Sequence, residues 1–174
     1  MKQASLLCLG MFLLVLGGCS GKQGRKEAPL KENMSLKYQI SFTHMGTTKQ
    51  RTEVLKFRKL ENGNFEFTRY FIDDFGDREV EKTEVSPYFM EKEVMPVNLE
   101  GKHLWMDPKM LASGKPDYMN ITKTTFNGRD VYSARTGGEE TSYYLADSGI
   151  IAGSEFKHEN TISSAMLLEI DSFQ

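Results

Sequence analysis

The sequence predicts a mainly β protein, in which about ten short antiparallel strands form a meander that curls into a half-barrel or a closed barrel. The first observation is alternation: Leu36, Tyr38, Ile40 and Phe42 are separated by polar residues, as in a strand with one buried face. The second is that such segments recur along the chain, with turn residues between them. The chain has no internal repeat, no GxGxxG motif and no P-loop.

The turns and edges follow from particular residues. The Asn-Gly pairs at 62–63 and 127–128 predict tight hairpins, because both residue types tolerate a positive φ angle. Segment 78–85 alternates but is mostly charged, which suits an edge or solvent-facing strand. The expected strands cover residues 36–43, 47–60, 65–73, 78–85, 88–95, 118–126, 129–136, 141–146, 150–157 and 161–173.

One short helix is expected in the middle of the chain, at about residues 108–113. Asp107 is a good N-cap, and Pro108 fits the first helical position, where no backbone N–H is needed. Gly114 follows the last helical residue, where a left-handed conformation often ends a helix.

The N-terminal segment has the order of an export signal. Lys2 supplies a positive charge, residues 4–16 are almost entirely apolar, and small residues precede Cys19. The apolar run is short of the roughly 20 residues that a transmembrane helix needs. Residues 16–19, Leu-Gly-Gly-Cys, resemble the lipobox of bacterial lipoproteins at every position. An ordinary cleaved signal and an uncleaved membrane anchor remain as alternatives.

The lipoprotein resemblance implies a location and an anchor. In that family the signal, here residues 1–18, is cut off and Cys19 receives a diacylglycerol and a further acyl chain such as palmitate. Several acyl chains hold a protein stably at a membrane. Ser20, in place of an aspartate, weakly favours the outer membrane over the inner one. Residues 19–35 then form the lipidated cysteine and a flexible tether, and residues 36–174 form a single β-rich domain without any thiol.

Composition and motifs exclude several kinds of chemistry. The formal net charge of −2 gives no basic surface for nucleic acid. The histidines at 44, 103 and 158 are far apart in sequence, so we expect surface or turn positions and no metal site. The acidic segment 73–77 lacks the ligand order of an EF-hand and is typical of a hydrated turn. No catalytic constellation is visible, so we expect a protein that is not an enzyme and needs no cofactor.

An apolar cluster around the irregular middle segment is the remaining candidate surface. Methionine adapts to variable shapes, and such residues could cap the concave face of a curved sheet as a surface for an apolar ligand or a partner. Ordinary core packing beside the only helix is the favoured alternative. The cluster consists of Met90, Met95, Leu104, Trp105, Met106, Met110 and Leu111.

The second half of the chain carries a looser resemblance. Residues 127–134, 141–144 and 148–151 form a Gly-containing hairpin, a Tyr-Tyr strand and a Gly-Ile turn. This order resembles the C-terminal part of envelope proteins with strongly curved antiparallel sheets, related in shape to the LolA and LolB lipoprotein carriers. The resemblance implies a fold and leaves the activity open.

Three functional hypotheses follow from these features. The favoured one is a membrane-anchored, non-enzymatic envelope lipoprotein that binds an apolar ligand or a lipidated partner on its curved sheet. The alternative is an accessory or structural lipoprotein that docks on another envelope protein, for example through an exposed strand edge. A hydrolytic enzyme is the least favoured.

Overall fold

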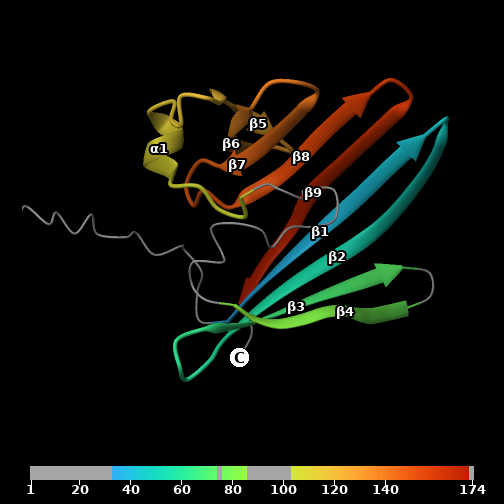
Figure 1. Cartoon of the computed structure of the whole chain (residues 1–174), viewed down its shortest axis with the longest axis vertical. Coiled ribbons are helices and arrows are strands. Elements are labelled where there is room, and N and C mark those ends of the chain that lie inside the picture. Colours follow the sequence, from blue (N-terminus) through green and yellow to red (C-terminus); the bar gives the residue numbers. More distant parts are fainter. Residues whose placement is uncertain (1–32, 74–75, 86–102, 173–174) are drawn as a thin grey trace, which may run out of the picture.

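A computed structural model describes residues 33–73, 76–85 and 103–172, which form one antiparallel sheet and one short helix (Figure 1). This confirms the predicted mainly β fold class with an open, curved sheet. Nine strands lie within the described residues, and the further strand expected at 88–95 lies outside them. The strands are β1 (Asn33–His44), β2 (Thr47–Lys59), β3 (Phe65–Asp73), β4 (Gly76–Val85), β5 (Asn120–Phe126), β6 (Arg129–Arg135), β7 (Glu140–Leu145), β8 (Ile151–His158) and β9 (Thr161–Ser172).

The sheet consists of two meanders joined at one seam. Its strand order is β4-β3-β2-β1-β9-β8-β7-β6-β5, so the first strand of the chain pairs with the last. β4 and β5 form the two ends of this order and do not pair with each other. β4 carries mostly charged, exposed residues, as predicted for an edge strand, and such charges discourage pairing with other chains.

One buried tyrosine shows how strongly the sheet curves. The hydroxyl of Tyr38 on β1 donates a hydrogen bond to the backbone oxygen of Ile151 on β8, at 3.0 Å. β9 lies between these two strands, which in a flat sheet would be about 10 Å apart. The side chain of Tyr38 therefore reaches over β9, and its complete burial raises the pKa of its phenol.

The turns agree with the sequence at one Asn-Gly pair and differ at the other. Asn127 and Gly128 have φ angles of 51° and 71°, as a two-residue hairpin requires. At the other pair only Gly63 has a positive φ. There the turn is wider, because Leu60 donates its backbone N–H to the Asn64 oxygen. The Asn62 side chain also accepts the Asn64 N–H, which closes the wider turn.

The helix α1 (Pro108–Ala112) forms where the sequence predicts it and ends one residue earlier. The Asp107 side chain accepts the Lys109 N–H at 2.8 Å, which is the expected N-cap bond. Gly114 has a φ of 72° just beyond the helix. Leu111 is 1% exposed and packs into the core of the sheet.

The core connects both meanders. Large side chains from β1, β2 and β3 (Leu36, Leu55, Phe57, Phe67) are fully buried, and Tyr144 and Ile151 continue the same cluster into β7 and β8. Among the described residues, no helix is long and apolar enough to span a membrane.

Candidate functional site

Strands β8 and β9 separate halfway along β9. They pair from His158 and Thr161 at the hairpin turn as far as Gly153 and Met166. Beyond Met166, residues 167–172 of β9 pair only with β1 among the described strands. The second half of β9 therefore presents a strand edge inside the molecule rather than at the end of the sheet.

Two β-bulges accompany this separation. In the pairing of β1 with β9, the register shifts between Lys37 and Tyr38, so Leu168 has no partner on β1. In the pairing of β7 with β8, the register shifts between Tyr143 and Tyr144. A bulge bends its strand and increases the local twist. β8 thus begins away from β9, and no described strand pairs with residues 167–172 on that side.

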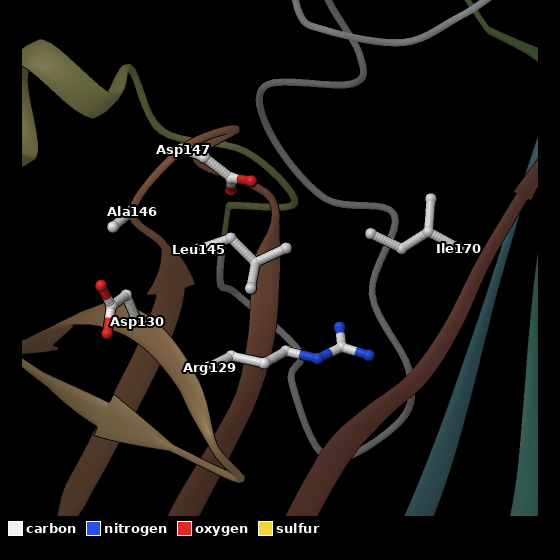
Figure 2. A pocket seen from close by; sticks show the side chains of 6 residues that line it. All are labelled: Arg129, Asp130, Leu145, Ala146, Asp147 and Ile170. Atoms are coloured by element: carbon white, nitrogen blue, oxygen red, sulfur yellow. The ribbon is translucent and has the colours of Figure 1, made fainter.

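The space on that side is a groove of about 640 Å³, which we call the β9 groove. Figure 2 shows Leu145 at the end of β7 and Ile170 on β9 on opposite sides of it, with Arg129 reaching from β6 toward β9. Ile170 is 40% exposed, and its neighbour Leu168 is exposed to the same extent. The lining residues are Arg129, Asp130, Leu145, Ala146, Asp147 and Ile170.

The Arg129 guanidinium binds the edge of β9 directly. Its Nη2 donates a hydrogen bond of 3.1 Å to the backbone oxygen of Leu168, the bulged residue. A side chain thus supplies the donor that a neighbouring strand would supply in a continuous sheet. Among the described residues of the lining, one side chain is cationic and two are anionic.

The hairpin of β5 and β6 is held against β8, and this positions Arg129. The Phe126 ring stacks on Tyr143, with ring centres 4.2 Å apart and an interplanar angle of 11°. It also occupies the space above Gly153, where a Cβ atom would lie 2.7 Å from the ring. The Ala165 backbone oxygen would lie closer still, at 2.2 Å from that Cβ. Glycine at 153 therefore leaves room for both neighbours, and the close approach of the hairpin places Arg129 within reach of Leu168.

A second, smaller cavity of about 220 Å³ lies beside β7 and is lined by hydroxyl groups. Of its lining residues, Ser142 and Tyr144 are buried, whereas Tyr118 is 67% exposed. Burial of Tyr144 raises the pKa of its phenol, although hydrogen bonds from Ser142 and the His103 backbone oppose this.

Five residues of the apolar cluster predicted from the sequence are described, and three of them belong to the core. Leu104, Met106 and Leu111 are nearly fully buried, which corresponds to the alternative of ordinary core packing. Met110 is 42% exposed on the helix. None of these residues lines the β9 groove. Met90 and Met95, like Cys19, lie outside the described residues.

Trp105 lies in a short segment that continues the sheet beside residues 148–151. It forms an antiparallel bridge with Ile150, and its indole Nε1 donates to the Ser148 oxygen at 2.6 Å. The Met106 N–H donates to the Gly149 oxygen at 3.0 Å. A Cβ at 149 would lie 1.9 Å from the Met106 oxygen, so only glycine fits there.

Two histidines that are distant in the sequence lie close in the fold. His44 on β1 and His158 on β8 both face Thr161 of β9, and both are exposed as expected. His44 Nδ1 is 2.9 Å from the Thr161 hydroxyl, and His158 Nδ1 is 2.5 Å from a Glu139 carboxylate oxygen. Within the described ranges, no three such side chains could hold a metal ion.

The β9 groove itself has no signal in the sequence. Arg129, Leu145 and Ile170 are ordinary members of three separate strands or turns, and only the register of the sheet brings them together. A local clue exists in the adjacent apolar residues Leu167 and Leu168, which interrupt the alternation of β9. Such an interruption is typical of a bulge.

No protein-family model matches the chain, and no curated protein matches it in sequence. Several solved structures are similar in fold at low identity. The MucA/MucB complex of Pseudomonas aeruginosa gives a TM-score of 0.42 and 13% identity, with 79% of this chain and 51% of that chain covered. A DUF1329 family protein from Desulfovibrio piger gives a TM-score of 0.33 and 6% identity, with 83% of this chain and 87% of that chain covered.

An outer membrane lipoprotein-sorting protein domain from Vibrio parahaemolyticus is also similar, with a TM-score of 0.26, 7% identity, and 80% and 85% of the two chains covered. The chain spans about half the length of the first of these structures. All three scores lie below 0.5 and therefore carry no argument about function. The chain is similar in fold to these three structures.

Proposed function

We propose that the chain is a lipid-anchored, non-enzymatic protein of the bacterial envelope, which binds an apolar ligand or a lipidated partner in the β9 groove. The observation that carries this proposal is the open apolar lining. Ile170 faces Leu145 across the groove and keeps 40% of its surface exposed, next to the equally exposed Leu168. Burying such a side chain contributes about 1.5–3 kcal/mol when it is complete.

The anchor in this proposal is Cys19, with residues 1–18 removed and the outer membrane as the favoured location. The argument is the lipobox order of residues 16–19 and the polar segment that follows it. In this scheme residues 19–35 lead into the domain 36–174. β1 begins at Asn33, so the last residues of the expected tether already belong to the sheet.

Ligand binding is tested with a dansyl-labelled undecanoic acid, whose emission increases and shifts to the blue in an apolar site. We expect saturable binding by the protein and at least a tenfold weaker affinity in Ile170→Ser, because the apolar contact is lost. Ile162→Ser is the matched control, since Ile162 is exposed on the same strand but distant from the groove. Equal affinity in both variants would contradict the assignment of the groove.

The anchor is tested separately by metabolic labelling with palmitate. Cys19→Ala is expected to abolish the label and to leave the signal uncleaved at this site. Cys8→Ala, which changes the cysteine inside the apolar run, is the control and should be labelled normally. Continued labelling of the Cys19 variant would refute the lipoprotein anchor without affecting the groove.

A further inference from the structure

The unpaired half of β9 is a binding surface in its own right. In an antiparallel sheet every second residue directs its N–H and C=O groups toward the same neighbouring strand. For residues 167–172, one side is occupied by β1 and no described strand occupies the other. These six residues extend over about 20 Å, which is the length of an ordinary strand.

The β4 end of the sheet differs from this inner edge. β4 is protected by charge along its whole length, since six of the residues in Asp77–Glu84 are charged and all are exposed. On β9, by contrast, Leu168 and Ile170 are exposed and apolar. The hydrogen bond from Arg129 to the Leu168 oxygen shows that at least one backbone group of this edge points into the groove. A carbonyl oxygen has a second lone pair, so it can accept a further donor.

We propose that the β9 groove binds an extended peptide segment of a partner protein, which adds to β9 as a strand between β9 and the β7–β8 turn. This deepens the proposed function, on which it rests, by naming the part of the partner that is recognised. Main-chain hydrogen bonds to residues 167–172 supply affinity, and an alternate apolar side chain fits between Leu145 and Ile170.

The charge of the groove adds a sequence preference. Among the described lining residues, Asp130 and Asp147 outnumber Arg129, and Asp147 is exposed at the turn. A segment with alternating apolar residues and flanking lysines or arginines is therefore complementary to the site. An acidic segment of the same shape binds more weakly.

The test uses two synthetic peptides and the full chain in phospholipid nanodiscs. The first peptide is Lys-Val-Thr-Val-Thr-Val-Lys with blocked ends, and the second is the same sequence with every internal backbone nitrogen methylated. Methylation keeps the side chains and removes the donors that a strand needs. Hydrogen–deuterium exchange is followed by mass spectrometry with fragmentation that resolves residues 161–166 from residues 167–172.

We expect the unmodified peptide to slow exchange in residues 167–172 by at least tenfold and to leave residues 161–166, already paired with β8, unchanged. Ile170→Ser should weaken this binding about tenfold, whereas Ile162→Ser should not change it. Equal binding of the methylated peptide, or binding without protection, overturns strand addition. In that case binding of the dansyl acid still supports the proposed function, and failure of both probes overturns both proposals.

Discussion

Adding a single methyl group at Gly149 is expected to lower the free energy of unfolding by several kcal/mol. Its φ of 74° lies in the left-handed region, which costs about 1–2 kcal/mol for alanine. An alanine Cβ would also lie 1.9 Å from the Met106 oxygen and 3.0 Å from the Trp105 indole nitrogen. Because the first contact is with backbone, the segment containing Trp105 has to move away.

The magnitude of the effect follows from the hydrogen bonds of that segment. Movement breaks the bonds Met106 N–Gly149 O, Ile151 N–Leu104 O and Trp105 Nε1–Ser148 O. At about 1 kcal/mol each, their loss adds about 3 kcal/mol to the conformational cost. Gly128→Ala is the matched control, because Gly128 has a φ of 71° and a Cβ atom there would have no neighbour within 4 Å.

The assay is urea unfolding, followed by circular dichroism and by the fluorescence of Trp105, the only tryptophan. With a slope of about 1–3 kcal/mol per molar urea, Gly149→Ala should unfold at least 1 M earlier than Gly128→Ala. The emission of Trp105 in the folded variant should also shift to the red, since the ring leaves its partly buried position. Coinciding midpoints of the two variants would refute the steric reasoning.

Three further outcomes are expected. Tyr38→Phe should lower the free energy of unfolding by about 1–3 kcal/mol in thermal or urea unfolding, because a buried carbonyl on β8 loses its donor. Arg51→Gln should lower the free energy of unfolding by about 3 kcal/mol at pH 7, because it removes contacts of 2.5 and 2.9 Å from the fully buried Glu53 carboxylate. Arg58→Gln, at a partly exposed pair, should lower it by less than about 1 kcal/mol. Burial and the hydrogen bond to Glu155 raise the pKa of Tyr143 to about 12, so its contribution to stability is present below pH 10 and lost between pH 10 and 12. Tyr143→Phe should therefore flatten the fall in stability over that range, and an unchanged profile would argue against this assignment.

The parts of the fold that depend on neighbours in sequence were predictable. Alternation in β1 places Leu36, Tyr38 and Ile40 in the core, and the Asp107–Pro108 pair starts the helix. The turn at 127–128 follows from local preferences of asparagine and glycine for positive φ. The Asn62 turn differs because a side-chain hydrogen bond stabilises a longer loop, and two-residue propensity does not include that bond.

The candidate site was not predictable in the same way. Arg129 and Leu168 are 39 positions apart, and their contact depends on a bulge in β9 and on the glycine at 153. A shift of one residue in either of the two strand pairings that join β7 to β9 would turn Ile170 or Leu145 to the other face. Local patterns specify which residues form strands, but the register between distant strands is set by packing of the whole core.

The seam between β1 and β9 has a consequence for the order of folding. Each meander consists of hairpins between neighbouring strands, which form quickly because their loops are short. The seam joins residues more than 110 positions apart, such as His44 with Thr161 and Tyr38 with Leu167. During synthesis from the N-terminus, β1 has no partner on that side until the last strand has emerged. The two meanders can therefore form early. The cooperative stability of the whole sheet, and with it the β9 groove, arises only when β9 pairs with β1.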